Sequence, residues 1–234
     1  MNGNDTLIPG KGQLSGAAAK RQTLAVGRQR VESLMGEVKR MILILNGSPR
    51  KTGVTTTLLR IIADEARSAG AEVEWVDVNN LSIRPCIGCL KCRPDHECIL
   101  PKDDANRIGE LIERCSGLVV GTPTYWGNMT GPLKLLFDRI VPTIEHYELY
   151  TWRFPRPKHK GKKAAIVTAS LAPFPFNQLP SQSRGALRAV KTVLNAGGFD
   201  IRRQINVPLP PDPAQIGERW LKKARKLGRE IGSW

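Results

Sequence analysis

The sequence lacks any run of about 18 apolar residues, so it offers no candidate for a membrane-spanning helix. Its beginning also lacks the basic and then apolar layout of a secretory signal. Residues 20–40 are basic, as in a transit peptide, but the serine content of such a peptide is missing. Four of the five cysteines are clustered, which argues against a disulfide scaffold and for a metal or redox site in a reducing compartment. We therefore expect a cytoplasmic protein.

Any recognisable set of catalytic side chains is also absent. No Ser-His-Asp set is visible, and neither His146 nor His159 belongs to a recognisable catalytic group. The adjacent Asp138 and Arg139 are interpreted as a structural ion pair. We therefore predict no catalytic residue in the protein part of the site.

Negative charge is scarce, because 36 Lys and Arg face 21 Asp and Glu and leave a net charge of +15. The densest stretch, residues 152–163, holds six basic residues and no acid. No helix-turn-helix, zinc-finger or RNA-recognition pattern accompanies the charge, so we expect no nucleic-acid partner. A nucleic-acid-binding module remains an alternative, which would show steeply salt-dependent DNA affinity. We favour a surface that attracts anionic nucleotides and acidic electron-transfer partners.

The length of 234 residues suits one α/β domain with an extension. We expect residues 1–40 to be an extension, disordered at first and then helical, and residues 41–234 to be the domain. Alternatively, Met41 is the true start. Within the domain, we predict a cysteine-rich loop over 79–101 and a C-terminal helix over 212–232.

Apolar runs of strand length alternate with stretches of helical periodicity through the domain. This alternation predicts a doubly wound parallel sheet of five strands with helices on both faces. The order 2-1-3-4-5 would place a crevice between the first and third strands. The predicted strands are 41–45, 73–78, 117–122, 163–168 and 199–207.

The first predicted strand leads into a polar, glycine-containing loop, Asn46–Gly53, and then into a helix. The N-terminus of a helix after such a loop is an anion site, because its backbone N–H groups and its dipole point at one spot. The glycine spacing matches neither a Walker loop nor the GxGxxG fingerprint. We predict a phosphate ligand, although a Ser/Thr-rich turn that binds nothing is the alternative. The side-chain donors would be Ser48, Arg50, Thr55 and Thr56.

Two further stretches follow the third and fourth strands and should reach the same edge of the sheet. The first, Pro123–Met129, offers flat rings at Tyr125 and Trp126 and a close backbone approach at Gly127. The second is Ala169–Leu171. A turn that only covers the sheet end is the alternative, but beside an anion site we favour an aromatic ligand that carries a phosphate.

Four cysteines, Cys86, Cys89, Cys92 and Cys98, follow the pattern C-x2-C-x2-C-x5-C. A C-x2-C-x2-C run with a further cysteine can ligate a [4Fe–4S] cluster, which is the interpretation we favour. Zinc on these sulfurs, or on three of them with His96, is an alternative, as are a Cys86–Cys89 disulfide and free thiols. Cys115 lies on a buried helical stripe and is expected to belong to the core.

Three segments together, GSPRKTGVTTTLL, PCIGCLKC with its following cysteine and KDD, and PTYWGNMTGPLKLLFDR, resemble the NADPH-dependent FMN reductase family in its iron–sulfur flavoprotein branch. The resemblance implies a flavodoxin-like fold, FMN as cofactor, NAD(P)H as co-substrate, and a homodimer or homotetramer. It assigns the phosphate to the four donors named above. The chain departs from the family pattern at Val54 and in the stretch after the fourth strand, which lacks the usual glycines. The resemblance places the flavin ring along Pro123, Thr124, Tyr125, Trp126, Gly127 and Asn128.

We therefore expect an FMN-dependent NAD(P)H oxidoreductase that passes electrons, through a [4Fe–4S] cluster, to a protein or small-molecule acceptor. The absence of acid–base residues agrees with this, because a flavin supplies its own chemistry. The alternatives are a non-enzymatic FMN electron carrier and a cluster-free NAD(P)H:quinone or flavin reductase.

Overall fold

The computed structural model describes residues 40–93, 97–146, 156–208 and 213–234. The predicted N-terminal extension and its helix lie outside the described residues, as do His96 and part of the basic stretch 152–163.

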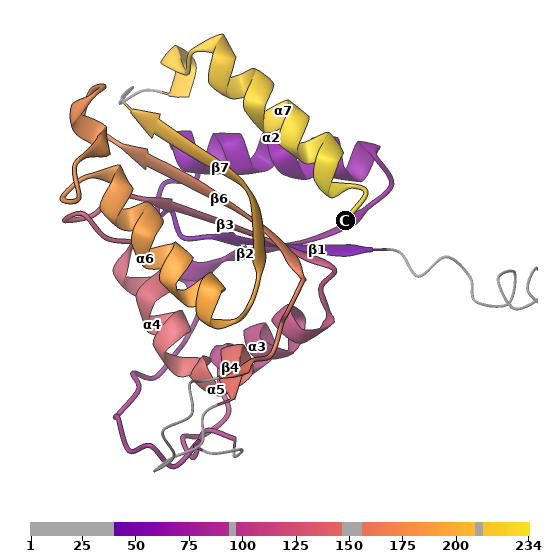
Figure 1. Ribbon diagram of the computed structural model, residues 1–234, viewed down its shortest axis with the longest axis vertical. Coiled ribbons are helices and arrows are strands. Elements are labelled where there is room, and N and C mark those ends of the chain that lie inside the picture. The colour runs from indigo at the N-terminus through magenta and orange to yellow at the C-terminus, as the bar shows by residue number, and fades with distance from the viewer. Residues whose placement is uncertain (1–39, 94–96, 147–155, 209–212) are drawn as a thin grey trace, which may run out of the picture. The chain divides into compact units, whose positions relative to one another are not determined.

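The centre of the domain is a five-stranded parallel sheet in the order β2-β1-β3-β6-β7 (Figure 1). The predicted α/β architecture with five parallel strands is confirmed. The order differs from the predicted 2-1-3-4-5 in its numbering, because a short antiparallel pair, β4 and β5, is inserted in the chain between β3 and β6. Two-residue strands leave no periodic pattern in a sequence. The strands are β1 (Met41–Asn46), β2 (Glu72–Asp77), β3 (Gly117–Pro123), β4 (Glu145–His146), β5 (Arg156–Pro157), β6 (Lys163–Ser170) and β7 (Asp200–Pro208).

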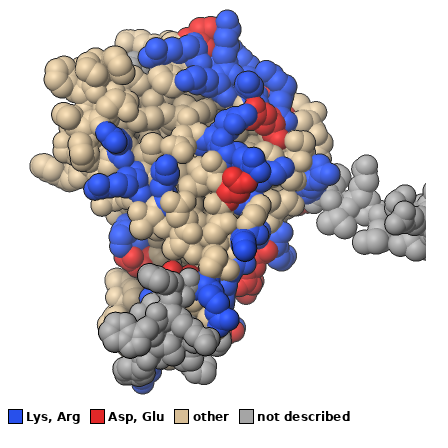
Figure 2. Space-filling view, in the orientation of Figure 1, with Lys and Arg blue, Asp and Glu red and all other residues tan. Residues whose placement is uncertain are grey.

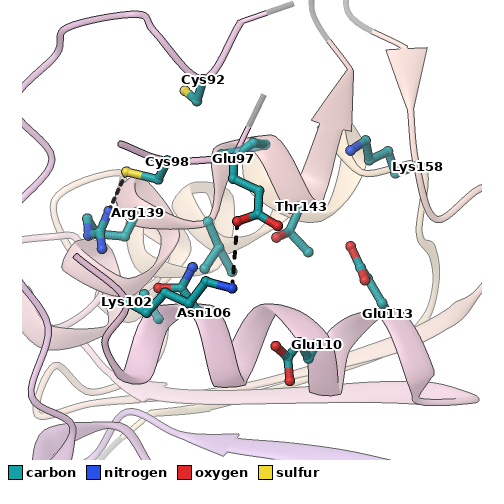
Figure 3. Close-up of a pocket in the computed structure, with 13 residues that line it drawn as sticks. Cys92, Glu97, Cys98, Lys102, Asn106, Glu110, Glu113, Arg139, Thr143 and Lys158 are labelled. Carbon is teal, nitrogen blue, oxygen red and sulfur yellow. Dashed lines mark hydrogen bonds and ion pairs between the residues drawn. The ribbon is translucent and has the colours of Figure 1, made fainter. Parts of the chain in front are cut away.

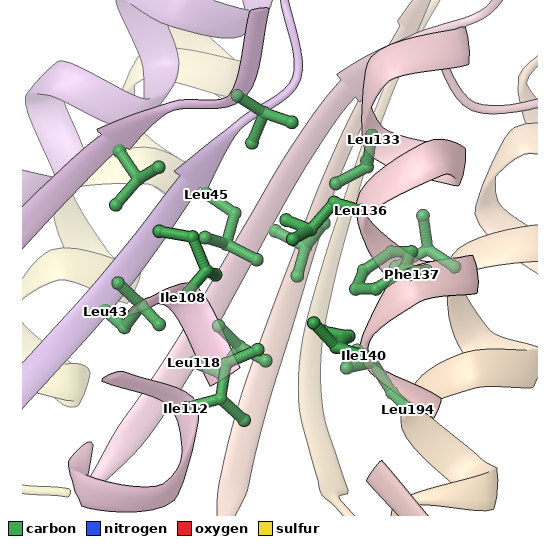
Figure 4. Close-up of a cluster of buried hydrophobic side chains, with 14 of the residues drawn as sticks. Leu43, Leu45, Ile108, Ile112, Leu118, Leu133, Leu136, Phe137, Ile140 and Leu194 are labelled. Carbon is green, nitrogen blue, oxygen red and sulfur yellow. The ribbon is translucent and has the colours of Figure 1, made fainter. Parts of the chain in front are cut away.

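Helices cover both faces of the sheet, because each central strand is apolar on both sides. In β1, Leu43 and Leu45 pack toward α3 and α4, whereas Ile42 and Ile44 pack toward α2 and α7. Figure 4 shows the first of these two cores. The helices are α2 (Val54–Ser68), α3 (Asp104–Arg114), α4 (Gly131–Arg139), α5 (Val141–Ile144), α6 (Ser183–Ala196) and α7 (Glu218–Ile231), with 3-10 turns at Val78–Asn80, Phe176–Gln178 and Pro213–Gln215.

The C-terminal helix is shorter than predicted, since α7 begins at Glu218 rather than near residue 212. A 3-10 turn starting at Pro213 precedes it, and Gly217 is its N-cap. Proline restricts the backbone of the residue before it and lacks an N–H donor, which delays the helix. Within the described part of the chain, no helix is long and apolar enough to cross a membrane.

Candidate functional site

The loop after β1 is held in place by Asn46, the last residue of that strand. Its side chain is buried; its amide Nδ2 donates to Asp77 Oδ1 at 2.8 Å, and its Oδ1 accepts from Ser48 N at 3.1 Å. Asn46 and Asp77 are partners across the parallel β1–β2 pair, so both strand ends support the loop. From the sequence, Asn46 is only the first residue of the predicted loop, and no local pattern indicates this role.

Gly47 fixes the other side of the loop against β3. Its N–H donates to Gly121 O at 2.7 Å, and its carbonyl accepts from Thr130 Oγ1 at 2.9 Å. A Cβ at this position would lie 3.0 Å from Gly121 O, a tighter contact than most side chains make, so the close approach favours glycine. The loop is therefore held between the carboxyl ends of β1 and β3, where the crevice was predicted.

The loop ends at the N-terminus of α2, where Gly53 is the N-cap and makes no side-chain cap. The first turn of α2 contains no acidic residue. Because the first N–H groups of a helix have no partner within it, this end is electropositive and open to an acceptor. Arg50 is exposed beside it. The geometry is that of an anion site.

A pocket of about 130 Å³ opens over this helix end and joins most of the predicted ligand residues. It also includes the stretch after β6, so three strand ends contribute to it. Thr124 N donates to Ala169 O at 2.8 Å, which links the loops after β3 and β6. The lining residues are Ser48, Pro49, Arg50, Gly53, Val54, Thr55, Pro123, Thr124, Tyr125, Ala169, Ser170 and Leu171.

Two buried hydroxyls in the pocket wall, Thr124 Oγ1 and Ser170 Oγ, have no hydrogen-bond partner among the residues that the structure describes. A buried polar atom without a partner is costly, and a bound polar ligand would supply one. Together with the open helix end, these orphaned hydroxyls fit a ligand such as FMN, which has a phosphate and a ring with polar edges.

Thr56 lies beside the pocket rather than in its wall. Its hydroxyl donates to Arg50 O at 2.7 Å, so the side chain stabilises the loop. The structure thus brings Ser48, Arg50 and Thr55 to the pocket and places Thr56 behind them.

The predicted ring-binding stretch forms a tight turn. Tyr125 and Asn128 exchange two backbone hydrogen bonds of 2.9 Å, and Trp126 and Gly127 both have positive φ, of 51° and 70°. Positive φ at both central residues defines a type I′ turn. Pro123, Thr124 and Tyr125 line the pocket, whereas the Trp126 side chain is fully exposed at the tip.

The cysteine-rich loop lies at the opposite end of α4 from this turn (Figure 1). Cys86 and Cys89 are exposed, and Cys92 and Cys98 are half-buried. Burial raises the pKa of the Cys92 thiol, and the neighbouring Cys98 and Cys86 sulfurs act in the same direction. Among the residues that the structure describes, no three metal-ligating side chains are gathered closely enough to hold an ion.

One buried guanidinium, that of Arg139, anchors the end of this loop (Figure 3). Its NH1 donates to Cys98 Sγ at 2.6 Å and its NH2 to Asp103 Oδ2 at 3.0 Å. Asp103 also accepts from Arg84 N at 3.0 Å, so both ends of the loop meet at one carboxylate. The predicted Asp138–Arg139 pair is therefore wrong: Asp138 points outward and pairs with Lys134 one helical turn earlier.

The environment of Asp103 favours its ionised form. Burial alone would raise the pKa of this carboxyl, but hydrogen bonds from Arg84 N–H, Arg139 and Ala105 N–H outweigh it and lower the pKa. Asp103 is also the N-cap of α3, in a capping box with Asn106. The Asp103 carboxylate thus connects the end of the cysteine loop to the start of α3 by hydrogen bonds and an ion pair.

Cys92 and Cys98 line a second cavity of about 220 Å³, between the loop, α3 and α5 (Figure 3). Four thiols within 13 residues fit an iron–sulfur cluster in type and number. Ligation would require the loop to draw the sulfurs together. Zinc would use the same thiols and would require the same movement, since no group of three metal-ligating side chains is formed among the described residues. The iron–sulfur and zinc alternatives therefore differ in the metal that is bound and not in the position of the site.

Two other residues are part of the structural core. Burial raises the pKa of Cys115 to about 11, which keeps this thiol protonated and inert. Burial, with Lys162 and Lys158 nearby, lowers the pKa of His159 to about 4. Its Nε2 lies 2.9 Å from Thr143 O, to which the neutral ring donates.

Comparison with known proteins gives consistent matches. A sequence profile of the NADPH-dependent FMN reductase family matches residues 40–201. An iron-sulfur flavoprotein of Archaeoglobus fulgidus is 28% identical over 187 residues, which are 79% of this chain and 76% of that protein. An iron-sulfur flavoprotein of Methanocaldococcus jannaschii is 33% identical over 108 residues, 46% of this chain and 55% of that protein. Beyond the first, the chain spans about half the length of the iron-sulfur flavoproteins that it matches.

Solved structures share the fold. The NAD(P)H:quinone oxidoreductase from Methanothermobacter marburgensis superposes with a TM-score of 0.62 at 20% identity, over 83% of this chain and 100% of that one. The azoreductase AzrA superposes with a TM-score of 0.64 at 14% identity, over 81% and 99% of the two chains. At these identities the similarity shows a flavodoxin-like α/β fold alone.

Proposed function

This chain belongs to the NADPH-dependent FMN reductase family, in the branch of the iron–sulfur flavoproteins, and from that premise we propose how its residues serve an NAD(P)H-dependent oxidoreductase. Residues 41–234 form the FMN-binding domain, and FMN lies in the pocket between the ends of β1, β3 and β6. The observation that carries this proposal is the pocket itself, in which an open helix N-terminus and two orphaned hydroxyls face one cavity.

In this proposal the phosphate of FMN lies at the N-terminus of α2. The first N–H groups of the helix and the hydroxyls of Ser48 and Thr55 donate to it, and Arg50 closes over it from solvent. Asn46 and Thr56 keep the loop in shape. Val54 contributes only its backbone N–H, which the helix end leaves available.

The flavin ring lies along the stretch from Pro123 to Asn128. Thr124 and Ser170 donate to its polar edge, and Tyr125 covers a flat face and excludes water from it. When bound, FMN supplies the redox chemistry, accepting a hydride from NAD(P)H and releasing electrons to an acceptor. The protein contributes orientation and electrostatics, which agrees with the prediction that no side chain is catalytic.

Cys86, Cys89, Cys92 and Cys98 would hold a [4Fe–4S] cluster, which supplies one-electron transfer when it is bound. The number and spacing of the thiols and the printed names of the relatives support this. The acceptor is a protein or a small oxidant such as a quinone. Without the cluster, the same pocket supports a direct NAD(P)H:quinone or flavin reductase.

A homodimer or homotetramer is part of the proposal. Large apolar side chains are exposed in the two segments that contribute to the pocket: Trp126 after β3, and Leu171, Phe174 and Phe176 after β6. Apolar side chains gathered at one site mark a contact surface. A second copy of the chain would cover them and shield the flavin. The cytoplasmic location remains a prediction.

Adding NADPH or NADH anaerobically to the FMN-loaded protein tests the proposed function against a non-enzymatic carrier. A reductase loses its visible flavin absorbance, whereas a carrier that takes electrons from a protein stays yellow. Iron and acid-labile sulfide measured on the same sample decide the cluster: about four iron per chain supports it. Bound zinc, or no metal, contradicts it.

A further inference from the structure

A groove of about 580 Å³, separate from the two cavities described above, lies between α6 and the edge strand β7. Three basic side chains of α6 line it: Arg184, Arg188 and Lys191. Their spacing of four and three residues puts them on one stripe of the helix. No acidic residue is among those that line the groove. In the space-filling view, Lys and Arg stand out on the face of α6 and β7, and acidic side chains are few (Figure 2).

These three cations differ from their neighbours in having no ion-pair partner among the described residues. On the adjoining surface, Arg203 pairs with Glu230 at 2.8 Å and Arg229 with Glu65 at 2.9 Å. Like charges one turn apart destabilise a helix, and Arg184 in the first turn of α6 also opposes the helix dipole. An arrangement that is unfavourable in the free protein becomes favourable when an anion binds.

The groove adjoins the rim of the FMN pocket. The first turn of α6 packs on the turn that carries Trp126, so closely that a Cβ at Gly185 would lie 2.1 Å from Gly127 O. Tyr125, at the base of that turn, lines the FMN pocket. From there the basic stripe runs away along α6 for about 10 Å, at 1.5 Å per residue. A ligand stacked at the flavin can therefore extend into the groove.

We propose that this groove binds the phosphates of NADPH, with Arg184, Arg188 and Lys191 contacting the pyrophosphate and the 2′-phosphate. The inference rests on the proposed function and adds the substrate preference of the same site. The groove volume is that of a small-molecule site rather than a flat docking surface. Arginine forks and a lysine ammonium suit phosphate oxygens, and the 2′-phosphate, which adds a charge of about −2, is the group that distinguishes NADPH from NADH.

The test compares two triple variants that remove the same charge. One carries Arg184→Gln, Arg188→Gln and Lys191→Gln. The control carries Lys222→Gln, Lys223→Gln and Lys226→Gln on α7, which lies on the other face of the sheet. We expect the groove variant to raise the KM for NADPH at least about tenfold and to change the KM for NADH less, since charge-assisted bonds to the 2′-phosphate are lost. The kcat and FMN binding should be unchanged, and the control should behave as wild type.

Equilibrium binding of 2′,5′-ADP, measured by calorimetry, separates this inference from the proposed function. We expect wild type to bind 2′,5′-ADP more tightly than 5′-AMP, and the groove variant to bind the two equally. This result supports phosphate binding in the groove even if neither NADPH nor NADH reduces the flavin. Equal binding of 2′,5′-ADP by wild type and the groove variant overturns it, whether or not NADPH reduces the protein. So does a groove variant that loses binding of polyglutamate while 2′,5′-ADP binding persists, since that assigns the groove to an acidic partner.

Discussion

Asn46 is the residue on which the anion site most depends. It is buried, and its amide connects β2, the loop and α2 through Asp77, Ser48 and Thr56. Replacing it leaves the N–H of the buried Ser48 without its acceptor, which costs about 1–3 kcal/mol, whereas Asp77 still accepts from Trp75 Nε1 and Thr56 still donates to Arg50 O.

We predict that Asn46→Ala lowers the free energy of unfolding by about 1–3 kcal/mol and weakens FMN binding. Urea titration and flavin fluorescence titration measure the two effects. Asn80→Ala, an exposed asparagine just after β2, is the control and should change neither. An Asn46 variant with wild-type stability and FMN affinity would show that the loop does not need this brace.

Arg139 is the corresponding residue of the cysteine loop. Its loss leaves the half-buried Asp103 carboxylate without its charged partner. We predict that Arg139→Gln lowers the free energy of unfolding by about 3 kcal/mol, because the variant leaves the Asp103 carboxylate partly buried with no opposite charge beside it. Chemical denaturation measures this, with the exposed Arg114→Gln as control. A change below about 1 kcal/mol would mean that the loop is held by other contacts.

His159 makes stability depend on pH. Its pKa is about 4 in the folded protein, against an ordinary value of 6.5, because burial and two lysines disfavour its charged form. The unfolded chain therefore binds more protons between these values, and stability falls as the pH drops from 6.5 toward 4. We predict a loss of about 2 kcal/mol between about pH 7 and pH 5.

Urea denaturation of wild type and His159→Gln across this range measures the effect. The variant should lose most of the pH dependence, whereas His146→Gln should keep it. Equal slopes in wild type and His159→Gln would refute the assignment.

At this scale the sequence revealed residue types better than residue partners. Ser48, Arg50 and Thr55 were predicted from their place around a helix N-terminus, and they line one pocket. Cys98 and Arg139 are 41 residues apart in the sequence, and no local sequence pattern predicts that they are in contact. Arg139 was instead assigned to its neighbour Asp138, although adjacent residues point to different faces of a helix.

At the scale of elements, the contact between α6 and the turn Tyr125–Asn128 connects the two proposed ligand surfaces. A Cβ at Gly185 would lie 2.0 Å from Pro180 O and 2.1 Å from Gly127 O. Both obstacles are backbone atoms, so the helix or the turn must move.

We predict that Gly185→Ala lowers the free energy of unfolding by about 1–3 kcal/mol and weakens FMN binding, because overpacking displaces the turn. Thermal unfolding and flavin titration measure these effects. Gly131→Ala, where nothing lies within 4 Å of the added methyl, is the control. Unchanged FMN affinity in Gly185→Ala would separate the turn from the flavin site.

The main elements were predictable because the central strands are apolar runs and the long helices carry an apolar period of helical spacing. The structure adds α5, β4 and β5, whose lengths of two to four residues are below the length at which periodicity can be read. The start of α7 was predicted early because apolar residues before Glu218, such as Ile216, pack in the core without being helical.

At the scale of the whole molecule, one sheet with a core on each face brings together strand ends that lie far apart in sequence. The pocket combines residues 48–55, 123–125 and 169–171. The order β2-β1-β3-β6-β7 is what makes these three stretches neighbours. The fold class therefore predicted the position of the site, but the hydrogen-bond and ion-pair partners of each side chain could be identified only in the structure.

A ligand that joins three strand ends should stabilise the entire domain. We predict that FMN raises the midpoint of thermal unfolding, because binding at about 100 times Kd stabilises a folded state by about 2.7 kcal/mol. Calorimetry with and without FMN measures this, and riboflavin, which lacks the phosphate, should stabilise much less. Equal stabilisation by both flavins would exclude the α2 N-terminus as the phosphate site.

The most direct test of the account is an anaerobic titration of the FMN-loaded protein with NADPH, followed by visible absorbance. We predict complete loss of the flavin band after about one equivalent of NADPH per FMN, since a hydride carries two electrons, or after about one and a half equivalents where a [4Fe–4S] cluster takes one electron more. A flavin band that persists in excess NADPH and NADH would contradict the proposed oxidoreductase activity. Failure to bind FMN at all would contradict the assignment of the pocket.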